Sequence, residues 1–165
     1  MLSLADPRIG RFVSKCMVVR VATLSTGGLP HLTPLWFVRS GGDFYMNTRA
    51  DSPAARDIAA NGDVVLLFDN ERGRSRRVLQ IRGRATFSAG KQFSPGILAR
   101  FTLKYYLNPG GAADIARNLR TVPARMLYYR ERAGEAGAIQ VTPETAELLP
   151  SLAGASTPSV SHPLE

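Results

Sequence analysis

The chain has 165 residues, 44% of them apolar, which suits one domain with a sizeable core and argues against a disordered chain. No apolar run approaches the ~20 residues that cross a bilayer, and the first residues lack a signal peptide's pattern, so we expect a cytoplasmic protein without membrane contact. The single cysteine, Cys16, excludes an intramolecular disulfide. The net charge of +8 favours anionic partners.

The first predicted element is a short helix over 5–15, with Asp6 as its cap and Pro7 at its first position. Strands over 16–25, 30–40 and 43–48 follow, separated by glycine turns, and they indicate an antiparallel meander. Because Pro30 and Pro34 cannot donate to a ladder, the second strand should lie at an edge or be irregular in its first half.

A second helix is predicted over 51–62, capped by Asp51 or Ser52. Strands over 63–70 and 78–89 follow, the latter with a bulge at Gly83. A helical insert is expected within 91–131, then a last strand over 137–142 that ends at Pro143. We therefore expect one α+β domain over 1–149, most simply a small antiparallel barrel, with a Pro/Ser-rich tail over 150–165.

Four segments in order carry a resemblance: VATLSTGGLPHLTPLWFV, GDFYMNT, SPAARDIAANGDVVLLF and LQIRGRATF. Together they resemble the flavin-binding split-barrel proteins related to pyridoxamine 5'-phosphate oxidase, a superfamily that includes reductases using the deazaflavin F420. The resemblance implies a six-stranded antiparallel split β-barrel with peripheral helices. It also implies a homodimer that holds the flavin in a cleft between its two subunits.

The oxidase's phosphate clamp is mostly absent from this chain. In the oxidase, an Arg and a Lys on the second strand and a Ser-Arg-Lys group at the helix start grip the phosphate. Those positions fall on Thr33, Val38, Ser52, Pro53 and Ala54, so only the serine is retained. We therefore do not expect a true pyridoxamine-phosphate oxidase.

Other residues around the second helix can replace that clamp. A helix N-terminus attracts anions, and Arg49 and Arg56 can hold phosphate in a fork. With Thr48 and Ser52 they form the expected phosphate cradle. Trp36 either walls the cofactor, closes the dimer or packs in the protein, and Gln80 either bonds the flavin ring or pairs within the sheet. The predicted cofactor-binding residues are Thr33, Pro34, Leu35, Trp36, Asn47, Thr48, Arg49, Ser52, Arg56 and Gln80.

The leading interpretation is an oxidoreductase that binds FMN non-covalently and acts on an unidentified small molecule. No Ser/His/Asp or Cys/His/Asn set is visible, so no residue is named as catalytic. One alternative is an F420H2-dependent reductase, whose anionic cofactor suits the arginine-rich stretch 71–84. Another is a split barrel that binds a flavin or other ligand without catalysis. Two histidines give little support to a metal or haem site, and the arginines lack the interleaved aromatics of a nucleic-acid surface.

Overall fold

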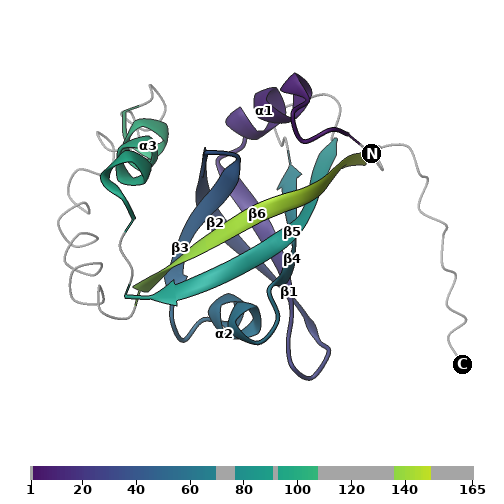
Figure 1. Cartoon of the computed structure of the whole chain (residues 1–165), viewed down its shortest axis with the longest axis vertical. Helices are drawn as coiled ribbons and strands as arrows, with labels where there is room; N and C mark the ends of the chain where they lie inside the picture. The colour runs from purple at the N-terminus through teal and green to yellow at the C-terminus, as the bar shows by residue number, and fades with distance from the viewer. Residues whose placement is uncertain (1, 70–76, 91–92, 108–135, 150–165) are drawn as a thin grey trace, which may run out of the picture.

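Six antiparallel strands close into a barrel in the computed structural model, which describes residues 2–69, 77–90, 93–107 and 136–149 (Figure 1). The expected α+β split barrel is confirmed. The parts of the predicted insert over 91–92 and 108–131, and the tail from 150, lie outside the described residues. Around the barrel the strands follow the order β1 (Val18–Leu24), β2 (Pro30–Ser40), β3 (Asp43–Arg49), β6 (Ala136–Leu149), β5 (Val78–Ala89) and β4 (Asp63–Asp69).

Among the described residues, three helices flank the barrel: α1 (Pro7–Ser14), α2 (Pro53–Ala60) and α3 (Pro95–Tyr105). The first two lie at opposite ends of the barrel, and α3 lies to one side (Figure 1). As predicted, Asp6 caps α1 by accepting the Arg8 N–H. Ser52, and not Asp51, caps α2. Both helices begin with proline, whose fixed φ suits the first turn.

The core fills the barrel with side chains that alternate along each strand. Phe37, Phe44 and Phe68 are fully buried, and the Phe37 and Phe68 ring centroids lie 5.0 Å apart. Each such side chain contributes roughly 1.5–3 kcal/mol on burial. Ile9 and Val13 of α1 join this core and close one end of the barrel.

The last strand is longer than predicted, because it does not end at Pro143 but continues to Leu149. Gly83 pairs with Pro143 while Arg82 pairs with Thr145, so Glu144 is the extra residue of a bulge. A bulge tolerates a residue without an N–H. The register shift between Arg82 and Gly83 confirms the predicted irregularity. A side chain at Gly83 would collide with the backbone of β6.

Strand β2 changes partner halfway along its length. Pro30–Trp36 pair with β1, whereas Phe37–Ser40 pair with β3. β2 is therefore not an edge strand, since it lies between β1 and β3, but its first half, with Pro30 and Pro34, has β1 as its one partner strand among the described residues. The unpaired side of this half of β2 forms an opening in the barrel wall. Helix α2 packs near this opening, against β1, β2, β3 and β5. The opening places one edge of β2 beside α2, where most of the predicted cofactor residues lie.

Candidate cofactor site

The start of α2 gathers two hydroxyl groups and several backbone donors. Thr48, near the end of β3, donates its hydroxyl to the Ser52 Oγ at 3.1 Å. Ser52 Oγ in turn accepts the Ala55 N–H at 3.1 Å, and the backbone carbonyl of Ser52 accepts the Arg56 N–H. Pro53 has no N–H, so the Ala54 N–H is the remaining donor of the first turn among the described hydrogen bonds. Because Ala54 is fully buried, the half-buried hydroxyls of Thr48 and Ser52 are the polar groups here that can meet an anion.

Arg49 already holds an anion, the carboxylate of Asp51. Its Nε donates to Asp51 Oδ1 at 2.7 Å and a terminal nitrogen donates to the other oxygen. The Arg49 guanidinium therefore holds the pKa of Asp51 below its usual value. The side chain of Arg56 is exposed one turn further along α2. The structure thus brings Thr48, Arg49 and Ser52 together, with Arg56 nearby, and adds a competing carboxylate to the predicted cradle.

The predicted residues of β2 divide between two faces of the strand. Phe37 is buried inside the barrel, and Leu35 packs partly against the same core. Alternation places Thr33 on that side too, while Pro34 and Trp36 lie on the outer face. Asn47 of β3 is also exposed. A ligand beside α2 therefore meets the edge of β2. Trp36, on the outer face of β2, points to a different side of the strand.

Trp36 is 41% exposed and is covered on one side by α3. Its ring stacks on Tyr105, with centroids 4.6 Å apart and planes 7° apart, and Tyr106 meets it edge-on. The packing alternative for Trp36 is thus realised on one face of the ring. Its exposed part stays a predicted interface or cofactor contact.

Gln80 lies apart from the other predicted residues within this chain. It sits on β5 opposite Leu67 and Glu147, and its neighbours Leu79 and Ile81 point into the core. Strands β1 and β4 separate β5 from β2, a path of about 14 Å along the barrel wall at ~4.8 Å per strand spacing. A role for Gln80 at the same ligand needs a long molecule or a second subunit.

Two open hollows lie away from the predicted residues. One of about 410 Å³ is bordered by β1, β4 and the bulge, and Thr23, Arg82 and Glu144 are among its lining residues. The other, of about 320 Å³, lies beneath α1 and includes Arg8 and Arg11. Neither is lined by any of the ten predicted cofactor residues.

A buried carboxylate on α2 was missed by the sequence reading. Asp57 is 5% exposed, and its Oδ2 lies 2.7 Å from both the Thr23 hydroxyl and Nδ1 of His31. Burial raises the pKa of Asp57, but these two hydrogen bonds outweigh it, so the net pKa is lowered. The available signal was helical spacing, because Asp57 shares a face with Ala54 and Ile58.

A second polar cluster joins α3 to the barrel. The Tyr105 hydroxyl accepts the Phe37 N–H at 2.8 Å and lies 2.8 Å from the carbonyl of Met17. Lys104 donates to the Phe37 carbonyl at 3.1 Å, with its ammonium 3.3 Å from the Phe37 ring centroid. Burial lowers the pKa of Lys104 to about 8 and raises that of Tyr105. This cluster holds α3 against Trp36.

Within the part of the chain that the structure describes, no three side chains of His, Cys, Asp or Glu are grouped to hold a metal ion. Among the described helices, none combines the length and apolar character that spanning a membrane requires.

Comparison with known proteins places this geometry in a family. A family model described as pyridoxamine 5'-phosphate oxidase matches residues 5–149. No curated protein matches the chain. The solved structures with a similar fold include a conserved hypothetical protein, Rv2991, from Mycobacterium tuberculosis, with 16% identity and a TM-score of 0.64 over 99% of this chain and 94% of that one.

Two further structures show how widely this fold is used. One is named an F420 Reductase, with 16% identity and a TM-score of 0.58 over 83% of this chain and 94% of that one. The other is HutZ from Vibrio cholerae, described as a heme storage protein, with 16% identity and a TM-score of 0.60 over 88% of this chain and 94% of that one. At these identities the similarity shows the fold alone.

Proposed function

The chain belongs to the pyridoxamine 5'-phosphate oxidase family, and on that premise we propose that it is an oxidoreductase that binds FMN beside α2. The observation that carries the proposal is the start of α2, where the Thr48 hydroxyl donates to Ser52 Oγ and Arg56 is exposed one turn further along the helix. Backbone donors at a helix N-terminus and arginine forks are the groups that bind phosphate.

These residues fit the phosphate of FMN, with one conflict. Asp51 is exposed and occupies the fork of Arg49, so a phosphate at this place competes with a carboxylate. Either the FMN phosphate displaces the Asp51 carboxylate from Arg49, or Arg49 shares its N–H donors between the phosphate and that carboxylate. Arg56, on α2, is a second cation near Asp51, and its positive charge already lowers the pKa of Asp51 and of Asp57.

The chemistry of the reaction belongs to the cofactor, since bound FMN supplies hydride transfer. The protein's own residues bind and orient it. In this proposal the start of α2 holds the phosphate, while the unpaired edge of β2 faces the remainder of the molecule. The oxidase's own substrate is not expected here, because Pro53 and Ala54 replace two basic residues of its clamp.

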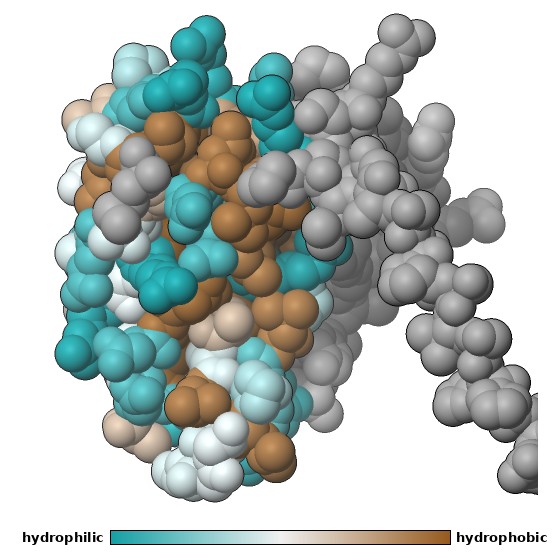
Figure 2. Space-filling view, turned by 90° about the vertical axis from the view of Figure 1, so that its right-hand side faces the viewer, coloured by the Kyte–Doolittle hydropathy of each residue, from teal (hydrophilic) through white to brown (hydrophobic). Residues whose placement is uncertain are grey.

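A homodimer is part of the same proposal. Leu24, Leu32 and Trp36 are large apolar residues exposed on the β1–β2 hairpin. Figure 2 shows one side of the molecule on which apolar residues form a broken band among hydrophilic ones. A stable interface of this kind buries on the order of 2,000 Å² or more. Light scattering at micromolar concentration should give twice the chain mass, and a strict monomer would contradict the homodimer.

Coenzyme F420 is the second candidate, favoured by the charge of the chain. The net charge is +8, and exposed Arg82 and Arg84 lie on β5, the former beside the larger hollow. A cofactor with a phosphate and an anionic tail gains from such charge. A protein that binds a ligand without catalysis is the remaining alternative.

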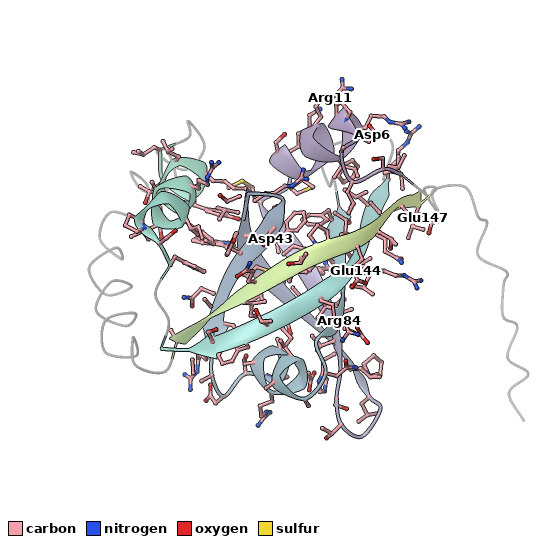
Figure 3. The ribbon with its side chains drawn as sticks, viewed as in Figure 1. Asp6, Arg11, Asp43, Arg84, Glu144 and Glu147 are labelled. Atoms are coloured by element: carbon pink, nitrogen blue, oxygen red, sulfur yellow. The ribbon has the colours of Figure 1, made fainter. Side chains whose placement is uncertain are left out.

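The test is a titration of the purified protein with FMN and with F420, followed by cofactor fluorescence. We expect FMN to bind and Arg56→Ala to weaken it about tenfold or more, since a charge-assisted bond contributes roughly 1.5–3 kcal/mol and each decade corresponds to ~1.4 kcal/mol. Arg11→Ala is the matched control, because Arg11 lies at the other end of the barrel (Figure 3). Preference for F420 selects the second candidate, and binding of neither refutes the proposed function.

A further inference from the structure

His31 is held through one ring nitrogen and exposed elsewhere. Its Nδ1 lies 2.7 Å from Asp57 Oδ2, while its side chain is 40% exposed. The lowered pKa of Asp57 keeps that carboxylate ionised, and an ionised carboxylate only accepts hydrogen bonds. Nδ1 therefore carries the proton, and in the neutral ring Nε2 is the nitrogen left to accept one.

Thr23 completes the arrangement from β1. Its hydroxyl donates to the same oxygen of Asp57 at 2.7 Å, so one buried carboxylate oxygen receives two donors. A buried carboxylate that bonds one imidazole nitrogen fixes the ring and stabilises the imidazolium when Nε2 takes up a proton. Among the described residues, Arg56 is the other charged group that acts on Asp57.

The His31–Asp57 pair is connected to the proposed cofactor site through α2. Asp57 follows the cap Ser52 by five residues, about 7.5 Å along the helix axis. His31 lies on the half of β2 that pairs with β1 alone, on the same strand face as Thr33 and Leu35. Contact with this imidazole therefore requires a ligand that extends from the start of α2 along the edge of β2.

We propose that His31, positioned by Asp57 and Thr23, supplies the proton that accompanies hydride transfer to a quinone or other carbonyl acceptor. The proposal rests on the proposed function. The acceptor receives a hydride with its electron pair from the reduced cofactor. The Nε2–H bond of the imidazolium breaks, an O–H bond forms on the acceptor, and solvent returns a proton to Nε2. Asp57 stays ionised throughout.

The first test needs no substrate. The chain has two histidines, His31 and His162, so ¹⁵N-histidine NMR gives two ring systems, assigned by a His162→Gln variant. We expect the neutral His31 ring to carry its proton on Nδ1, and Asp57→Asn to abolish that preference. Addition of FMN should shift the His31 signals and leave those of His162 unchanged. An Nε2–H tautomer, or FMN binding without a response at His31, overturns the proposal.

The second test separates proton transfer from electron transfer. Reduced FMN-loaded protein is mixed with menadione, which takes two electrons and two protons, or with ferricyanide, which takes one electron and no proton. His31→Gln keeps a polar group but cannot act as an acid, so reduction of menadione should slow about a hundredfold. Asp57→Asn should slow it less, and neither variant should alter the ferricyanide rate.

The outcomes distinguish this inference from the proposed function. Equal slowing with both acceptors indicates a structural role for His31 and overturns the inference, as does an unchanged menadione rate. If the parent protein binds no FMN, the proposed function fails and this inference fails with it. If FMN binds with normal affinity in His31→Gln and the menadione rate alone falls, both stand.

Discussion

Removing the hydroxyl of Tyr105 isolates one buried hydrogen-bond centre between α3 and the barrel. Tyr105 is 6% exposed, and its hydroxyl accepts the buried Phe37 N–H at 2.8 Å. Tyr105→Phe keeps the stacking on Trp36 but leaves that N–H without a partner. An unsatisfied buried donor costs ~1–3 kcal/mol, so we expect the free energy of unfolding to fall by about 2 kcal/mol. At roughly 2–4 °C per kcal/mol for this chain length, Tm should fall by roughly 4–8 °C.

The assay is urea and thermal unfolding followed by circular dichroism. The matched control is Tyr106→Phe, because Tyr106 is the adjacent tyrosine and is half exposed. Its free energy of unfolding should change by less than ~0.5 kcal/mol. If Tyr105→Phe is as stable as Tyr106→Phe, the hydroxyl does not hold α3 on β2, and the reasoning about this cluster is refuted.

Three further predictions follow from single features. Arg49→Ala should weaken FMN binding about tenfold. Asp51→Asn should strengthen it, because the substitution removes the negative charge that competes with the phosphate for Arg49. Affinities equal to that of the parent protein in a fluorescence titration would contradict this. Burial lowers the pKa of Lys104 from its usual 10.5 to about 8. Between these two pH values the unfolded chain binds more protons than the folded chain, so the free energy of unfolding rises with pH. Lys104→Met should flatten that rise in urea unfolding at pH 7.5–10. Gly83→Ala should lower the free energy of unfolding by ~1–3 kcal/mol, because the added methyl group meets the backbone of β6. Gly10→Ala, in open space within α1, should raise the free energy of unfolding by ~0.5–1 kcal/mol. If both variants change the free energy of unfolding in the same direction, the packing argument is refuted.

Local signals explain why so much of the fold could be predicted. Asp6–Pro7 and Ser52–Pro53 specify helix starts through the chemistry of the chain itself. The prolines of β2 likewise mark the half of the strand that pairs with β1 alone among the described residues. Pro143 misled because its effect depends on a distant partner: the bulge opposite Gly83 lets β6 continue. The residues next to Pro143 do not reveal this bulge, because β5, with which β6 pairs, lies far away in the sequence.

The candidate site was predictable only in part, for a similar reason. Thr48 and Ser52 are close in sequence, and the structure joins them. The Asp57–His31 contact spans 26 positions, and only the helical spacing of Asp57 hinted at a buried carboxylate. Gln80 lies on a separate part of the barrel wall, so its predicted role requires a long ligand or a second subunit, and neither is encoded next to Gln80 in the sequence.

The central claim is that the start of α2 binds the phosphate of FMN. The most direct measurement compares the affinities of FMN and riboflavin, which share the ring system and differ by that phosphate. With two charge-assisted bonds at roughly 1.5 kcal/mol each, FMN should bind about a hundredfold more tightly, and Arg56→Ala should reduce this ratio about tenfold while riboflavin binding stays unchanged. Equal affinities for FMN and riboflavin in the parent protein would contradict the account.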